Sequence, residues 1–113
     1  GLLPDQVPAV GQGVWVPWFV KPAYSMTLAA RLAQTGASVL FAFAQRLPDG
    51  QGFALSCRPP SSPLPLDDLA ATAGAINQEL MKLISSCPEQ YLWGYNRYKT
   101  PRGWNAQPPE INL

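Results

Sequence analysis

Apolar residues recur at intervals of three and four positions over residues 67–86, and this helical period predicts the longest element of the chain. The apolar positions of this stretch are Leu69, Ala73, Ile76, Leu80 and Leu83. On a helix they lie along one face. Asp67 or Asp68 supplies an N-cap, and Pro88 limits the end because residues before proline disfavour the helical region. We therefore expect a helix over 67–86 that buries its apolar face against a sheet.

Two other stretches have the composition of strands. Residues 38–44 hold the longest apolar run, without polar alternation, which is typical of a central strand buried on both faces. Residues 52–58 alternate apolar with small or polar side chains, as a half-exposed strand does. The turn signal Pro48-Asp49-Gly50-Gln51 lies between them. The two stretches are therefore expected to pair as an antiparallel hairpin.

Two shorter stretches complete the expected fold. Residues 1–3 have the character of the end of a buried strand, which Pro4 stops because proline cannot donate to a sheet. Residues 25–35 predict a short helix with Ser25 as N-cap and Gly36 as its stop. The predicted fold class is α/β, with helices packed on a mixed sheet that contains residues 1–3, 38–46 and 52–58.

Composition and charge narrow the classes of function. The chain has 113 residues, of which 47% are apolar, enough for one domain with a modest core. A net charge of +1 excludes the broad positive field of a nucleic-acid-binding domain. Because histidine is absent and Cys57 and Cys87 lie far apart, no metal motif and no hydrolase triad is present. The spacing leaves open whether the two thiols are joined, and we expect them to be reduced. Any anion site must be local.

An aromatic-basic block occupies residues 88–99. It contains Tyr91, Trp93, Tyr95 and Tyr98 together with Arg97 and Lys99. On a helix the three tyrosines form one stripe, and the two cations form a solvated basic rim at its end. Such a surface suits a phosphorylated or lipid-like anionic partner. The alternative is a helix that docks its tyrosines on the core and leaves its charges in water.

Two blocks of the chain resemble the bacterial lipid A biosynthesis acyltransferases of the lauroyl/myristoyl group. The first is Gly1-Leu2-Leu3-Pro4-Asp5-Gln6, followed by Val14-Trp15-Val16-Pro17-Trp18-Phe19. The second is Pro88-Glu89-Gln90-Tyr91-Leu92-Trp93, followed by Arg97, Lys99 and Pro101-Arg102-Gly103. The resemblance implies that residues 1–103 are the C-terminal part of one acyltransferase domain with a glycerolipid-acyltransferase-like fold. Residues 104–113 then form a polar, Pro-rich tail.

This resemblance implies an activity that the chain does not carry alone. The family moves a fatty acyl chain from acyl carrier protein to a lipid A precursor in lipopolysaccharide biosynthesis, without a cofactor or metal ion. Its catalytic signature is a histidine followed four residues later by Asp or Glu, and this chain has no histidine. The general base and an apolar membrane anchor are thus expected in a longer parent protein, at the cytoplasmic face of the bacterial inner membrane. The 113-residue chain should be inactive by itself.

The resemblance also implies a set of site residues. Asp5 is expected to support catalysis, although an Asx-type turn is an equal alternative. The expected substrate-binding residues are Gln6, Trp18, Phe19, Glu89, Gln90, Tyr91, Trp93, Arg97 and Lys99. The rings of residues 14–19 would line an acyl-chain pocket or belong to the core. The sequence departs from the family where Val20 replaces a common glycine and where Tyr95 and Asn96 replace a usual His-Arg pair, which thins the basic patch.

Other functions and partners remain open at this point. The alternative to the enzyme is a non-enzymatic module that binds an anionic lipid or protein through the aromatic-basic block. For the parent protein we expect acyl carrier protein, a lipid A precursor and the membrane surface as partners, and no nucleic acid. The isolated chain is expected to leave strand edges and apolar surface uncovered, and hence to associate as a homodimer.

Overall fold

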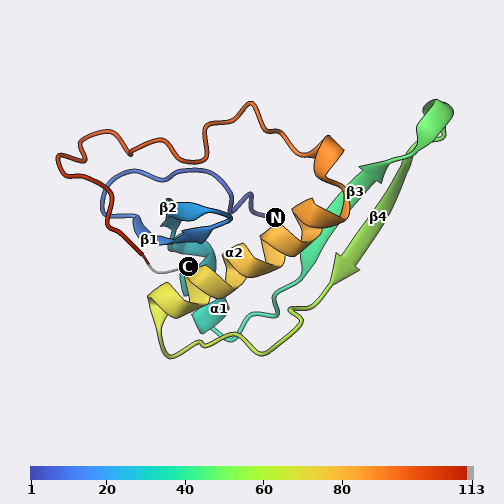
Figure 1. The fold of residues 1–113 in the computed structure, drawn as a ribbon. Coiled ribbons are helices and arrows are strands. Elements are labelled where there is room, and N and C mark those ends of the chain that lie inside the picture. The colour runs from blue at the N-terminus through green and yellow to red at the C-terminus, as the bar shows by residue number, and fades with distance from the viewer. Residues whose placement is uncertain (112–113) are drawn as a thin grey trace.

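Two β-hairpins and two helices make up the chain in the computed structural model, which describes residues 1–111 (Figure 1). In chain order the regular elements are β1 (Gly13–Trp18), β2 (Lys21–Met26), α1 (Leu28–Gln34), β3 (Phe41–Arg46), β4 (Phe53–Arg58) and α2 (Leu69–Ser86). Single 3-10 turns follow β3 at Pro48–Gly50 and α2 at Pro88–Gln90. The α/β class is thereby confirmed.

The sheet differs from the predicted one. β1 pairs only with β2 and β3 only with β4, each pair antiparallel, so the described residues hold two small sheets and not one mixed sheet. Residues 1–3 form no strand, which corrects that prediction, because no neighbouring strand is placed to bond them. The β1–β2 hairpin was not predicted. Pro17 and Pro22 lie opposite each other in its register, at a pair that needs no N–H donor.

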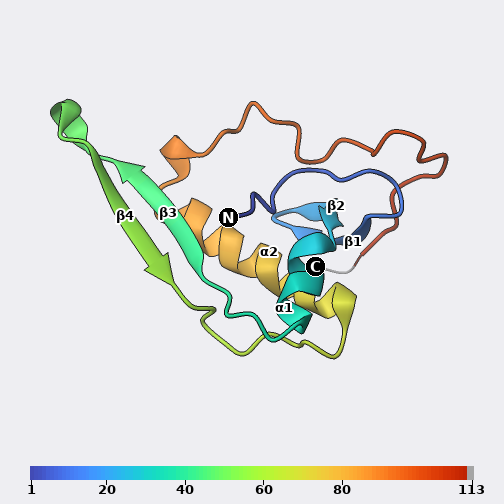
Figure 2. The ribbon, with the colours of Figure 1, turned by 180° about the vertical axis from the view of Figure 1, so that it is seen from behind.

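The long helix α2 is confirmed within two residues of the predicted bounds. The Asp68 side chain caps it by accepting a hydrogen bond from the Ala71 N–H at 3.0 Å. Ala73 and Ile76 are buried, and they form the centre of the core with Ala30 and Phe41. The other predicted apolar positions, Leu69, Leu80 and Leu83, pack around this cluster. Contacts of α2 with β1 and β2 and with β3 hold both hairpins on one helix, and α1 packs on the same helix (Figure 2).

The helix α1 is shorter than predicted, and its cap is different. It begins at Leu28, with Thr27 at the N-cap position, and Ser25 belongs to β2. The Thr27 hydroxyl donates to the Gln12 carbonyl and makes no capping bond. Ser25 is 2% exposed and instead bonds to residues of distant segments, described below. Its predicted role as an N-cap is therefore wrong.

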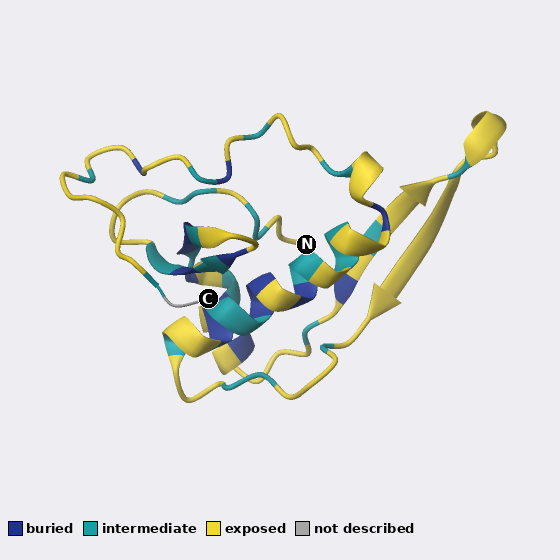
Figure 3. Ribbon diagram, viewed as in Figure 1, coloured by how far each residue is buried: buried dark blue, intermediate teal, exposed yellow. Residues whose placement is uncertain are grey.

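The predicted antiparallel pairing of β3 with β4 is confirmed, but the predicted burial of this hairpin is wrong. It projects away from the helices, and most of it is exposed (Figures 1 and 3). Phe41 is buried at the base, whereas Phe53 and Leu55 are 66% and 74% exposed. The expectation of a central strand buried on both faces is wrong for the described residues, because no second layer covers the hairpin.

Because this apolar surface is exposed, we still predict that the isolated chain associates with itself. We expect light scattering at micromolar concentration to give the mass of a dimer, because soluble monomers seldom expose such strand edges and apolar area. Leu55→Lys should shift the population toward monomer. A monomer at all concentrations would contradict this expectation.

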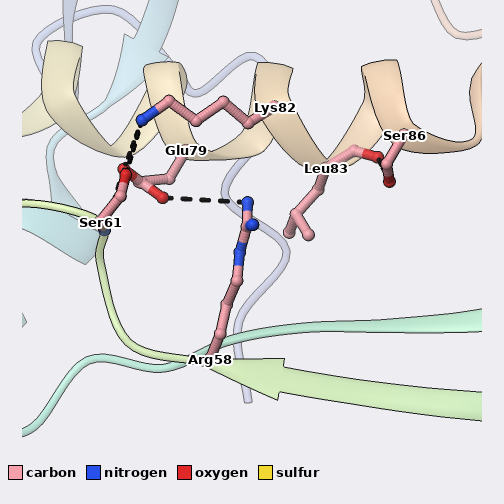
Figure 4. A network of polar contacts seen from close by, with 6 residues as sticks. All are labelled: Arg58, Ser61, Glu79, Lys82, Leu83 and Ser86. Carbon is pink, nitrogen blue, oxygen red and sulfur yellow. Dashed lines mark hydrogen bonds and ion pairs between the residues drawn. The ribbon is translucent and has the colours of Figure 1, made fainter.

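A buried carboxylate fastens the connection between β4 and α2 (Figure 4). Glu79 is 5% exposed, and its Oε1 accepts bonds from the Ser61 N–H at 3.2 Å, from the Ser61 hydroxyl and from Lys82 Nζ at 3.1 Å. Its Oε2 lies 4.0 Å from Arg58. Burial raises the pKa of Glu79, but the bonds from Ser61 and Lys82 outweigh it, so the pKa is below its ordinary value.

Replacing Glu79 should therefore lower stability in a pH-dependent manner. We expect Glu79→Ala to cost about 2–3 kcal/mol of unfolding free energy near neutral pH, since the hydrogen bonds from Ser61 and Lys82 to a buried charged acceptor are lost. Because the folded-state pKa is lowered, this contribution is present above the ordinary carboxyl pKa and disappears as pH falls through the lowered value. Urea unfolding of both proteins across acidic and neutral pH measures it. An unchanged difference down to strongly acid pH would contradict the pairing.

Candidate functional site

The aromatic-basic block does not form the predicted helix. After Pro88–Gln90, the described residues 91–111 hold turns but no helix, and they run along the β1–β2 hairpin (Figures 1 and 2). The tyrosines are held through their hydroxyls and not as a stripe. Tyr91 donates to Asp5 at 3.0 Å, Tyr95 accepts from the Val7 N–H at 2.8 Å, and Tyr98 donates to the Trp18 carbonyl.

Arg97 lies inside the molecule, which corrects its predicted place on a solvated rim. Its side chain is 4% exposed and donates to the Tyr24 carbonyl at 2.9 Å and to Ser25 Oγ at 2.7 Å. The guanidinium also lies 4.8 Å from the centre of the Trp18 ring. Burial lowers the pKa of Arg97, whereas the nearby Tyr91 and Asp5 act to raise it. The guanidinium stays charged. Arg97 thus fastens the carboxy-terminal segment to β2.

A buried amide on α2 extends this network. Asn77 is 2% exposed, and its amide donates to Ser25 Oγ at 2.8 Å and to the Pro17 carbonyl at 3.3 Å. Ser25 therefore receives bonds from both Asn77 and Arg97, and it donates to the Ala23 carbonyl. The hairpin, the long helix and the carboxy-terminal segment are joined at one hydroxyl. This buried network holds the surrounding rings in position, and only Arg97 Nε among its donors lacks a hydrogen-bond partner.

An aromatic hollow of about 510 Å³ opens between the turn of the β1–β2 hairpin and the carboxy-terminal segment. Its lining residues are Trp18, Phe19, Val20, Tyr91, Trp93, Gly94, Tyr95, Asn96, Arg97 and Tyr98. Two lysines flank it: Lys21 Nζ lies 4.5 Å from the Tyr98 ring centre, and Lys99 Nζ lies 5.1 Å from the Tyr95 ring centre. The hollow thus combines flat rings with positive charge at its edge.

A second cavity, the apolar groove, has a volume of about 600 Å³. It is bounded by residues 1–5 and by parts of α1, β3 and α2. Aliphatic and aromatic side chains dominate its wall, among them Leu2, Leu32, Val39, Phe43, Leu80, Leu83 and Ile84. The residues predicted as a strand at the amino end therefore line this groove.

Asp5 and Tyr91 lie where the two cavities meet. Both residues line the apolar groove, and Tyr91 also lines the aromatic hollow. Burial, followed by the neighbouring Asp5 carboxylate, raises the pKa of Tyr91 well above its ordinary value. The phenol thus stays protonated and donates its hydrogen bond to Asp5. The Asp5 carboxylate is accordingly bonded across 86 residues to the aromatic-basic block.

The remaining predicted residues lie in different places. Gln6 is exposed and lines neither cavity. Glu89 accepts a bond from the Cys87 thiol at 3.1 Å, and Gln90 bonds both backbone groups of Arg46, at 2.7 and 3.0 Å. Gln90 thus holds the end of β3 and also lines the apolar groove. The structure brings together Asp5, Trp18, Phe19, Tyr91, Trp93 and Arg97, with Lys99 at the edge.

Three residues of the site were not predicted from the sequence. Lys21 lies two positions after the aromatic run of residues 14–19, and that place beside predicted rings was a usable signal. Asn77 is a polar residue beside the apolar positions of α2, which signals a buried hydrogen bond. Ser25 gave no such signal, because a serine before a helical stretch also suits an N-cap.

The described residues offer no metal-binding cluster, no membrane-spanning helix and no disulfide. No three histidine, cysteine or acidic side chains of residues 1–111 are grouped so that they could hold a metal ion. No helix in the same part of the chain has both the length and the apolar character needed to cross a membrane. Both cysteines are free thiols, Cys57 exposed and Cys87 buried.

Comparison with known proteins agrees with the arrangement of the two sequence blocks. Residues 1–100 match the family profile of the bacterial lipid A biosynthesis acyltransferases. The chain is 39% identical over 103 residues to the lipid A biosynthesis lauroyltransferase of Escherichia coli (strain K12). That alignment covers 88% of this chain and 34% of the relative, so the chain spans about a third of the relative's length. On both grounds, the chain belongs to the bacterial lipid A biosynthesis acyltransferase family.

Proposed function

We propose that this chain is the substrate-binding part of an acyltransferase that moves a fatty acyl chain from acyl carrier protein to a lipid A precursor. The observation that carries the proposal is the meeting of two unlike cavities at the Asp5–Tyr91 pair. A lipid acylation brings a hydrocarbon chain and a charged sugar headgroup to one point. The apolar groove suits the first, and the aromatic hollow suits the second.

The apolar groove supports the acyl-chain part of the proposal. A saturated chain offers only apolar area to a protein, and each buried methylene contributes about 0.8 kcal/mol. The wall formed by α2 and β3 supplies such area through Leu80, Leu83 and Phe43. In this assignment the acyl chain lies against aliphatic residues of the groove. The rings of residues 14–19 contribute the hollow and the core instead of an acyl pocket.

The aromatic hollow supports the headgroup part. Flat rings such as Tyr91 and Trp93 present apolar faces with polar edges, which suit a sugar ring. Lys21 and Lys99 at its edge suit phosphate groups as mobile point charges. Arg97 contributes by fixing the hollow, because its donors are directed to Tyr24 and Ser25. Lys99 is thus the one predicted cation whose place suits direct contact with the headgroup.

The chemical step needs a group that this chain does not contain. We infer that the parent protein supplies a histidine as general base, which deprotonates a sugar hydroxyl of the acceptor. The hydroxyl oxygen then attacks the thioester carbonyl, and the thiol of acyl carrier protein leaves. The role assigned to Asp5 and Tyr91 is to hold the two substrates in line at the meeting point of their cavities. They are positioning residues in this account.

The proposed activity is tested by comparing the chain with its parent protein. The parent should transfer a lauroyl or myristoyl group from acyl carrier protein to a lipid A precursor, and the 113-residue chain should transfer none. Mass spectrometry of the extracted lipid measures both. Turnover by the chain alone would overturn the placement of the base. A parent that binds anionic lipid without transferring acyl groups would favour the non-enzymatic module.

A further inference from the structure

We propose that the apolar edge of the aromatic hollow, formed by Phe19, Val20, Leu92 and Trp93, docks on the surface of an anionic lipid bilayer. We name these four residues the apolar rim. The proposal rests on the proposed function and deepens it, because it assigns the direction from which a lipid headgroup enters the hollow. It places the bilayer against the turn between β1 and β2 and against the start of the carboxy-terminal segment.

The rim is a continuous exposed apolar surface built from two distant segments. Phe19, Val20, Leu92 and Trp93 are 37%, 80%, 74% and 57% exposed, respectively. The rings of Phe19 and Trp93 lie 6.1 Å apart, and Trp93 also contacts the Tyr91 ring at 4.8 Å. Three of the four residues line the hollow. An apolar partner that covers the rim would thus lie at the mouth of the headgroup site.

The backbone at Phe19 holds an apolar side chain outward at an energetic cost. Its φ is +51°, in the left-handed region that glycine and asparagine usually occupy. The Phe19 N–H bonds to the Met81 sulfur of α2, and the Trp93 indole donates to the Pro88 carbonyl at 2.7 Å. The Phe19 backbone and the Trp93 ring are therefore both held in place. Turns of this kind usually contain Asn and Gly. The exposed Phe19 and Val20 are therefore better explained by contact with an apolar partner than by a need for solubility.

The charges around the rim favour an anionic surface over an uncharged one. Lys21 and Lys99 are both exposed, and each stacks on a tyrosine that lines the hollow. The carboxylate beside the hollow, Asp5, is occupied by the Tyr91 hydroxyl. Tryptophan and tyrosine favour the boundary between headgroups and acyl chains, and lysines extend from it to anionic headgroups. Aromatic side chains flanked by two lysines match this boundary.

Site-specific fluorescence tests which surface of the chain meets the bilayer. On a Cys57→Ser background, Val20→Cys and Leu92→Cys each place an environment-sensitive dye on the rim, while Cys87 stays buried and unlabelled. Leu55→Cys is the matched control, because Leu55 and Leu92 are both 74% exposed and Leu55 lies on β4. The labelled full chain is mixed with phosphatidylglycerol or phosphatidylcholine vesicles that carry a nitroxide quencher among the acyl chains.

The expected result is loss of the dye's fluorescence at positions 20 and 92 with phosphatidylglycerol vesicles, and none at position 55. Lys21→Gln and Lys99→Gln should each weaken vesicle binding about fivefold, because this is the affinity that one basic residue adds near an anionic surface. Arg31→Gln, at an exposed position of α1, should leave binding unchanged. Equal quenching at all three positions, or none at 20 and 92, would overturn the proposal. Either result, together with acyl transfer by the parent protein, would leave the proposed function standing.

Discussion

Arg97→Ala is expected to destabilise the chain by about 3–5 kcal/mol, because two buried hydrogen bonds from a charged donor are lost, each worth about 1.5–3 kcal/mol. The variant loses the bonds to the Tyr24 carbonyl and Ser25 Oγ and the stacking on Trp18. The Tyr24 carbonyl is then left without this donor in a buried place, which carries a desolvation penalty. Urea unfolding followed by tryptophan fluorescence measures the change.

A nearby arginine provides the matched control. Arg102 is exposed, so Arg102→Ala should change the unfolding free energy by no more than about 0.5 kcal/mol. Arg97→Lys should recover little of the loss, because one ammonium on a flexible stem cannot reproduce the planar fork that reaches both acceptors. A stability of Arg97→Ala within 1 kcal/mol of the original chain would contradict the buried network.

Asp5→Ala in the parent protein is expected to lower kcat by up to about 100-fold, the cost of small misplacements of reacting groups. The carboxylate holds the Tyr91 hydroxyl at 3.0 Å where the two cavities meet, and its removal frees the ring between them. Tyr91→Phe removes the same bond while keeping the ring, so its effect should be in the same direction and smaller. Single-turnover transfer measures the loss.

The matched control separates positioning from folding. Glu79 is a buried residue of the β4–α2 connection and lines neither cavity. Glu79→Ala therefore removes a carboxylate without changing a cavity wall. It should lower stability but leave kcat per folded molecule unchanged. If Asp5→Ala behaves like Glu79→Ala, with full activity in the folded fraction, the turn interpretation of Asp5 is correct and the positioning role is wrong.

Local signals in the sequence were sufficient for the elements that depend on near neighbours. The period of α2, its cap at Asp68 and the turn between β3 and β4 all depend on residues within a few positions of one another. The burial of the β3–β4 hairpin was predicted wrongly, because burial depends on what covers a strand and not on its own residues. Val39 and Phe43 belong to an apolar run that is typical of a strand buried on both faces. No second layer lies over the hairpin in the described residues.

The sequence named most of the residues that the candidate site brings together, but it did not predict their geometry. Most of the residues brought together were named from the two blocks, because the blocks preserve the family pattern. The burial of Arg97 depends on a carbonyl 73 residues away at Tyr24, and no local pattern signals such a contact. The helical spacing of the tyrosines was misleading, since Pro88 and Gly94 favour turns in this stretch. The β1–β2 hairpin was not predicted, because residues 14–19 were interpreted only as buried or ligand-contacting rings.

Photo-crosslinking with an acyl chain tests the central claim most directly. The parent protein is incubated with acyl carrier protein that carries a lauroyl group with a diazirine near its end, and the labelled peptides are mapped by mass spectrometry. The account predicts labels on α2 near Leu80 to Ile84 and on β3 near Phe43, which line the apolar groove. Labels confined to residues 14–20 or to β4, with none in the groove, would contradict it.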